Sequence, residues 1–135
     1  MYRGLVALLA LVVVAAVVSG CGDDASADDV TVAIKYSHYQ PELITANAGE
    51  PVTITLRNDD PIEHEWIVGT ADVHERHRTG TEPVHDAIPT EVTIPALSTR
   101  VTTVMFSEPG EYLYVCHLPG HEAYGMVGTV QVVGE

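Results

Sequence analysis

The chain has 135 residues and a formal net charge of -13 at pH 7, with six Lys and Arg against 19 Asp and Glu. This length predicts one small domain. So few cations leave no basic surface to neutralise phosphates, which argues against nucleic acid and anionic lipid headgroups as partners. Eight Pro and eleven Gly interrupt a chain rich in Val and Thr. That composition favours short strands joined by turns, and hence an all-β domain.

The first feature along the chain is an apolar run. Arg3 precedes 14 apolar residues, 5–18, a length that fits a secretory signal and falls short of the roughly 18 needed to span a bilayer. The run ends in the sequence VSGC, which resembles the bacterial lipobox, whose Cys is lipidated and becomes the first mature residue. We expect residues 1–20 to be a lipoprotein signal peptide and Cys21 to carry the lipid. A signal peptide cleaved nearby and an uncleaved anchor are the alternatives.

A polar segment, residues 21–29, follows the signal and contains four Asp but no apolar periodicity. It is predicted to be an acidic tether between the lipid and the domain. The protein should then be exported and lipid-anchored to the cell membrane on its extracytoplasmic face. With Cys21 lipidated, Cys116 has no disulfide partner in an oxidising compartment. Such a thiol is either buried and inert or held by a metal.

Residues 30–135 are predicted to form the domain. Apolar and polar residues alternate over 30–36 and 52–56, as in strands with one buried face. Seven or eight short strands predict a two-sheet Greek-key β-sandwich. The connection 70–90 lacks this pattern and is expected to be a long functional or protective loop. The other predicted strands are 43–46, 65–69, 91–94, 99–106, 112–116 and 127–133.

The candidate chemistry is concentrated in residues 116–126, CHLPGHEAYGM. Cys116 offers a thiolate, His121 an imidazole and Met126 a thioether. Two His and one Cys in a trigonal plane with a weak axial Met form a type 1 copper centre. His64, at the start of a predicted strand, is the best source of the second His. His117 competes with His121, but strand alternation points His117 away from the side of Cys116, which favours His121.

These residues resemble those of the cupredoxins, the blue copper family, over residues 28–135. The most specific motifs are YLYVC at 112–116, followed by PGH and GM, with four residues between Cys116 and His121 and four between His121 and Met126. The resemblance implies a β-sandwich that holds one copper and shuttles single electrons between larger redox proteins. Glu65 departs from several relatives, which have Asn or Ser there to fasten the loop bearing the Cys, so the reduction potential is left open.

Three further histidines, His74, His77 and His85, lie in the 70–90 connection among carboxylates. They form a candidate second site for zinc or copper. The alternative is a polar surface loop whose histidines change charge between pH 5 and 8 and thereby tune docking of a partner.

The function expected from these features is electron transport by a monomeric, membrane-tethered cupredoxin. It would act at the outer face of the cytoplasmic membrane or in the periplasm. Its acidic surface would attract a basic patch on a cytochrome or an oxidase. Catalysis is not expected, because a four-ligand copper site leaves no open position for a substrate. The alternative function is a copper carrier or storage lipoprotein that delivers copper to an oxidase.

Overall fold

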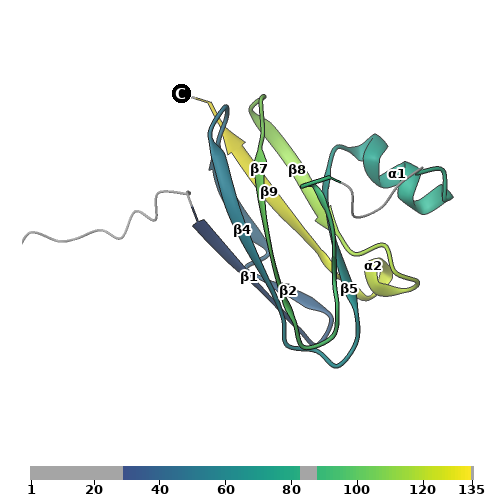
Figure 1. Ribbon diagram of the computed structural model, residues 1–135. Helices are drawn as coiled ribbons and strands as arrows, with labels where there is room; N and C mark the ends of the chain where they lie inside the picture. Colours follow the sequence, from purple (N-terminus) through teal and green to yellow (C-terminus); the bar gives the residue numbers. More distant parts are fainter. Residues whose placement is uncertain (1–28, 83–87, 135) are drawn as a thin grey trace, which may run out of the picture.

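The structure, a computed structural model, describes residues 29–82 and 88–134, and two sheets pack face to face in it (Figure 1). The first sheet has the order β2 (His38–Gln40), β1 (Asp29–Lys35), β4 (Pro51–Asn58) and β7 (Thr99–Met105). The second has the order β3 (Leu43–Asn47), β9 (Val127–Val133), β8 (Gly110–Val115), β5 (His64–Gly69) and β6 (Glu91–Ile94). The β1–β4 and β3–β9 pairs are parallel and the others antiparallel. The expected all-β sandwich is confirmed.

The described residues form nine strands, one more than the upper number expected. Each of the eight predicted strands is present, with ends shifted by a few residues. The additional strand is β2, which has only three residues and one buried side chain, Tyr39. Three residues are too few for an alternating pattern to be seen in the sequence.

The 70–90 connection is not wholly a loop, because it contains helix α1 (Ala71–Thr79). Gly80 ends the helix in the left-handed conformation, with φ 66°. The sequence pattern indicated this helix only weakly, since the buried side chains of α1 are the imidazoles of His74 and His77 and not apolar groups. In Figure 1, α1 lies on the outer side of the second sheet, close to the short helix α2 (His121–Tyr124). The helix packs against β5 and β8.

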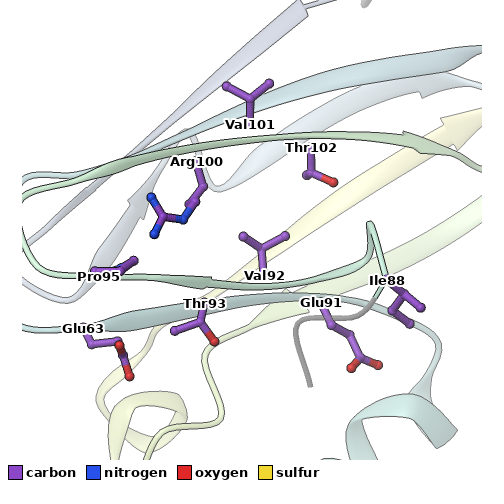
Figure 2. A pocket seen from close by; sticks show the side chains of 9 residues that line it. All are labelled: Glu63, Ile88, Glu91, Val92, Thr93, Pro95, Arg100, Val101 and Thr102. Atoms are coloured by element: carbon purple, nitrogen blue, oxygen red, sulfur yellow. The ribbon is translucent and has the colours of Figure 1, made fainter. Parts of the chain in front are cut away.

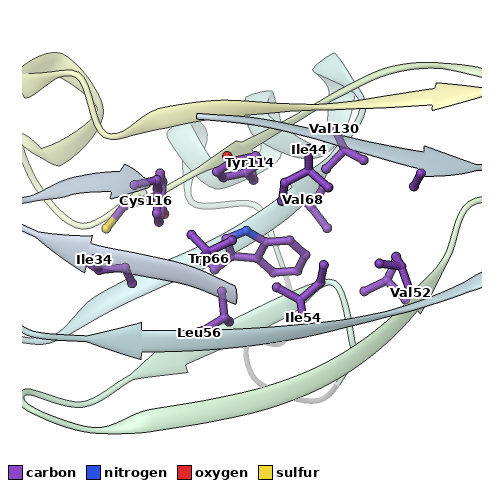
Figure 3. Close-up of a cluster of buried hydrophobic side chains, with 14 of the residues drawn as sticks. Ile34, Ile44, Val52, Ile54, Leu56, Trp66, Val68, Tyr114, Cys116 and Val130 are labelled. Atoms are coloured by element: carbon purple, nitrogen blue, oxygen red, sulfur yellow. The ribbon is translucent and has the colours of Figure 1, made fainter. Parts of the chain in front are cut away.

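The core lies between the two sheets and is centred on Trp66, which is completely buried (Figure 3). Strand β4 contributes every second residue, Val52, Ile54 and Leu56, and exposes or half-exposes those between. Burying each such side chain contributes about 1.5–3 kcal/mol. Cys116 lies in the same cluster, at one end of it. Cys116 is therefore anchored in the packed interior of the sandwich.

A close approach between β8 and β9 fixes the two strands that flank residues 116–126. Gly128 lies opposite Tyr114 in the register. A Cβ on Gly128 would come within 2.1 Å of the Tyr114 ring, so only Gly fits there. The Tyr114 side chain extends beyond Gly128, and its hydroxyl donates a hydrogen bond to the Pro41 carbonyl, 2.6 Å away.

The predicted signal peptide and Cys21 lie outside the described residues, as does all of the tether except Asp29. Within 29–82 and 88–134, no helix has both the length and the apolar character required to cross a bilayer.

Candidate metal centre

The pairing of β5 with β8 explains why distant histidines and the cysteine meet. The two strands are antiparallel neighbours, with Ile67 opposite Val115. His64 begins β5 and Cys116 directly follows β8, so both lie at the same end of the sheet. His121 begins α2, after a turn that starts at Cys116. Residues far apart in the sequence thus meet at one end of the sandwich.

Three donor atoms face one another at this end. The Nδ1 atom of His121 lies 3.2 Å from Nδ1 of His64 and 3.3 Å from Sγ of Cys116. One ligand atom from each residue lies within 4.8 Å of both others. His64 and Cys116 are completely buried, whereas His121 is partly exposed. The structure therefore brings together three of the four predicted donors in the arrangement that a trigonal metal plane requires.

Met126, the fourth predicted donor, is completely buried and packs in the same core cluster as Cys116. The backbone N–H of Cys116 donates to the Met126 carbonyl at 3.2 Å, and that of Met126 donates to the His121 carbonyl at 3.0 Å. Two glycines with positive φ, Gly120 at 85° and Gly125 at 108°, close the turns on either side of α2. These turns return the chain so that Met126 lies beside the Cys116 segment.

Asp60, a residue with no role predicted from the sequence, orients His64. The Nε2 atom of His64 lies 2.9 Å from Oδ2 of Asp60. Because a carboxylate accepts, neutral His64 donates from Nε2 and keeps the lone pair of Nδ1 directed at the other donors. Burial lowers the pKa of His64 although Asp60 acts in the opposite direction, so the ring is held neutral, as a metal ligand must be.

Asp60 is in turn held as a carboxylate. Burial alone would raise its pKa, but hydrogen bonds from the backbone N–H groups of Ser37 and Tyr36, together with His64, lower it. Those backbone bonds measure 2.8 and 2.7 Å. The sequence shows two carboxylates, Asp59 and Asp60, shortly before His64. It does not indicate which of the two faces the imidazole.

The Cys116 sulfur accepts a hydrogen bond from the backbone N–H of Glu65, at 3.3 Å. The Glu65 carbonyl in turn accepts a hydrogen bond from the hydroxyl of Tyr39. Burial raises the pKa of the Cys116 thiol, while this N–H and that of Leu118 lower it. This link between the two ligand segments uses the main-chain N–H of Glu65 and does not depend on its side chain.

His117 points away from the three donors, as strand alternation predicted, and lies under α1. Its Nε2 is 2.9 Å from Nδ1 of His74, whose Nε2 is 3.1 Å from the Leu113 carbonyl. A carbonyl only accepts, so neutral His74 donates from Nε2 and His117 donates to His74. Burial, with His74 second, lowers the pKa of His117 to about 4. His117 therefore fastens α1 to the segment that follows Cys116.

Two residues of the predicted second site, His74 and His77, have different partners in the structure. His74 is bonded to His117, whereas the donors of His77 group with those of Glu82 and Glu91. His85 lies outside the described residues. The carboxylates could not be linked to His77 from the sequence, because Glu91 comes from strand β6 and not from the connection itself.

The family model of the cupredoxin-like domain matches residues 8–130 of the chain. The chain belongs to the cupredoxin-like family. Among curated proteins, the copper-resistant cuproprotein CopI of Rubrivivax gelatinosus is 31% identical over 97 residues, which cover 70% of this chain and 59% of that protein. CopI of Pseudomonas aeruginosa is 24% identical over 136 residues, covering 76% and 75% of the two chains. This cupredoxin thus spans about 59% of the length of the first of these relatives.

Solved structures agree with the fold of this cupredoxin. The dithionite-reduced auracyanin of Roseiflexus castenholzii superposes with a TM-score of 0.67 at 21% identity, covering 80% of this chain and 98% of auracyanin. One thiolate, two imidazoles and a buried thioether are a donor set that suits copper in both of its common oxidation states. Family membership and the donor set together identify the cofactor as a single type 1 copper ion.

Proposed function

We propose that this cupredoxin carries single electrons between redox proteins, with copper bound by His64, Cys116, His121 and Met126. The observation that supports this proposal best is the set of three preorganised donors, each within 4.8 Å of the others. Cys116 as a thiolate balances one copper charge, so the centre is neutral as Cu(I) and carries one positive charge as Cu(II). Both states are tolerated in a buried pocket.

The hydrogen bonds around the donors favour electron transfer over chemistry at the metal. Asp60 fixes His64, and the backbone N–H of Glu65 fixes the sulfur. Ligands held in this way need to move little between the two copper states. Four protein ligands also leave no ready position for a substrate, so the proposed protein is not an enzyme.

Electrons are proposed to enter at the exposed side of the 116–126 segment. His121 is the only partly exposed member of the described His-Cys-His donor group. Beside it, Tyr124 is 64% exposed, and its ring stacks on His38 with 5.2 Å between centroids. A redox partner that covers these rings would approach the copper closely without entering the core.

The proposed cellular setting follows from the sequence. The apolar run ending at Cys21 supports a signal peptide and a lipid anchor at the extracytoplasmic face of the cell membrane, in an envelope where the partner is a cytochrome or an oxidase. The net charge of -13 supports a partner with a basic patch. The protein is proposed to act as a monomer. Globomycin, which blocks lipoprotein signal cleavage, should cause the precursor to accumulate, and Cys21→Ser should abolish labelling by a fatty acid.

The decisive experiment loads the full chain with Cu(II) and records the visible and electron paramagnetic resonance spectra. An intense thiolate-to-copper band that bleaches on reduction and returns on oxidation is expected. His121→Ala and Cys116→Ser should abolish the band. His117→Ala is the matched control, because His117 also lies next to Cys116 but points away from the donors. Copper that binds without the band, or a band lost in His117→Ala and kept in His121→Ala, would contradict the proposed ligand set.

Copper carriage is the second candidate function, and the copper-resistance names of the two CopI relatives favour it. The two functions differ in how fast metal leaves the site. An electron carrier should keep Cu(I) for hours against a chelator of comparable affinity and should exchange electrons rapidly with a cytochrome. A copper carrier should lose Cu(I) within minutes to the chelator, or to a copper-free acceptor domain, and should exchange electrons slowly.

A further inference from the structure

A second group of donor atoms lies outside the copper centre, where the C-terminal part of α1 meets the edge strand β6. It consists of His77 from α1, Glu82 from the segment after the helix, and Glu91 from β6. One ligand atom from each residue lies within 4.8 Å of both others. The three residues belong to three separate segments of the chain. Their convergence therefore depends on tertiary structure and is not a run of neighbouring acidic residues.

Glu91 is the member of the group whose burial is hardest to explain without a ligand. Its side chain is only 4% exposed, and Oε2 accepts no hydrogen bond from the described residues. A buried carboxylate oxygen without a hydrogen-bond partner destabilises the folded protein. Figure 2 shows that Glu91 points to the side of β6 that carries α1, while Val92 points toward β7. The carboxylate is thus directed at His77.

His77 presents a suitable nitrogen to this carboxylate. Its Nδ1 lies 2.9 Å from the Val73 carbonyl, one turn earlier in α1. Because a carbonyl accepts, Nδ1 carries the proton of the neutral ring and Nε2 carries the lone pair. That Nε2 lies 3.8 Å from Oε2 of Glu91, and the His77 side chain is completely buried. A hydrogen bond from the distal ring nitrogen to a carbonyl is the arrangement that orients histidine ligands in metal sites.

Glu82 completes the group from the solvent side, with a side chain 13% exposed. Its Oε2 accepts a hydrogen bond from Nε of Arg76 at 2.7 Å. A carboxylate has two oxygens, so Glu82 can keep Arg76 on one oxygen and offer the other to a cation. The positive charge of Arg76 opposes a cation, but Asp72 lies 3.0 Å from the same guanidinium and offsets it.

We propose that His77, Glu82 and Glu91 bind one divalent transition-metal ion of the borderline class, for which Zn²⁺ is the probe. Two carboxylates neutralise the charge of the ion, and one imidazole with two carboxylates matches the ligands that zinc accepts. The group lacks a thiolate, so it has no preference for Cu(I) and differs in chemistry from the His64-Cys116-His121 centre. The bound ion links α1 to β6. It also gives the Oε2 atom of Glu91 the partner that it otherwise lacks.

The test uses the full chain already loaded with copper, so that the first centre is occupied. Zn²⁺ is titrated by calorimetry, and both metals are counted by mass spectrometry after desalting. The wild type is expected to bind one Zn²⁺ per chain, keep its copper band, and unfold at a higher temperature with zinc than without it. Glu91→Gln and His77→Gln should each weaken zinc binding at least about tenfold. Their copper bands should not change.

Glu75→Gln is the matched control, because Glu75 lies on α1 with a side chain 66% exposed and outside the donor group. It removes the same charge and should bind zinc like the wild type. If Glu91→Gln does not fold, Glu82→Gln tests the site from its more exposed edge. The proposal is overturned if the wild type takes up no zinc, if zinc only displaces copper, or if the donor variants bind zinc as tightly as Glu75→Gln. Adding excess Cu²⁺ to the copper-loaded protein tests whether the site also accepts another ion of this class. A second electron paramagnetic resonance signal that is lost in Glu91→Gln supports binding at the same site.

Discussion

At the scale of single residues, the copper centre depends on groups that bind no metal. Asp60 holds the His64 ring through Nε2 and is itself held by two backbone N–H groups, so the position of His64 is set by the β1–β2 turn as well as by β5. Such supporting groups fix the tautomer and the orientation of a ligand before the metal arrives.

Asp60→Asn should therefore weaken copper binding without removing a ligand. Asn is nearly the same size but is neutral, and its amide accepts only at one atom, so it cannot serve the Ser37, Tyr36 and His64 groups equally well. We expect a loss of about 10–100-fold in copper affinity, measured by competition with a chelator. Asp59→Asn is the control, because Asp59 pairs with exposed Arg57. An affinity that is equal in the two variants would contradict the role given to Asp60.

Copper binding should also depend on pH through Cys116. Burial raises the pKa of this thiol, so the copper-free protein holds the proton at neutral pH and must release it when the thiolate binds copper. The apparent affinity for Cu(II) should rise about tenfold per pH unit between pH 6 and 8, for one released proton. Calorimetry in two buffers of different ionisation enthalpy counts that proton. A pH-independent affinity would mean that the thiolate already exists in the copper-free protein.

These residues also mark the limit of sequence reasoning. Cys116, His121 and Met126 could be predicted because their spacing lies within one short segment, and His64 because it begins a strand. Asp60 could not, because its contact with His64 depends on the path of a turn. The Glu65 contact with the sulfur could not either, because a main-chain donor leaves no mark in the sequence.

At the scale of elements, helix α1 acts as a brace for residues 116–126. His74 bonds His117, which directly follows Cys116, and the Arg78 guanidinium lies 2.6 Å from a carboxylate oxygen of Glu122. The His pair is buried, whereas the ion pair is partly exposed and contributes only about 0–1 kcal/mol. The buried imidazoles therefore dominate the attachment of α1.

Acid should loosen this attachment. The pKa of His117 falls from its ordinary value of 6.5 to about 4 in the folded protein, and that of His74 is also lowered by burial. Between pH 4 and pH 6.5 the unfolded chain therefore binds more protons than the folded protein. The free energy of unfolding is highest above pH 6.5 and decreases as the pH falls toward 4. Urea unfolding of the copper-free protein at several pH values measures this slope.

His117→Gln provides the comparison, because Gln can bond His74 but does not titrate. Its free energy of unfolding should fall less steeply than that of the wild type over the same pH range. Equal slopes would show that other groups account for the acid sensitivity.

The helix shows why the element pattern was only partly predictable. Strands β4 and β9 alternate apolar and polar residues, so the sequence revealed them. Helix α1 buries histidine on the sheet, and a periodicity of apolar residues does not detect buried imidazoles. Strand β2 is three residues long and was missed for lack of length.

At the scale of the whole molecule, charge is the dominant surface property. The formal net charge is -13, and three of the few cations, Arg57, Arg76 and Arg78, are engaged in ion pairs with carboxylates. The surface field should attract cationic partners and repel anionic ones over about 10 Å at 0.1 M salt.

The rate of electron transfer to a cationic partner should therefore fall as ionic strength rises. Stopped-flow mixing of the reduced protein with a basic cytochrome, between about 10 and 300 mM salt, should show a decrease of about tenfold or more. With an acidic cytochrome of similar potential the rate should rise with salt. A rate that is independent of salt for both partners would rule out steering by the surface charge.

The whole fold was the most predictable level, because two-sheet packing requires only that the strands alternate. What could not be predicted is the side of the sandwich on which α1 lies, and therefore the meeting of His77 with Glu91. That contact joins the helix to an edge strand that comes later in the chain.

The parallel β1–β4 and β3–β9 pairs have a consequence for how the protein reaches its final state. Each pair joins segments that are distant along the chain, as does the meeting of His64 with His121, and distant contacts close slowly. The metal donors therefore come together through contacts that the folded sandwich supplies, whereas an unfolded chain offers copper only separate cysteine and histidine side chains.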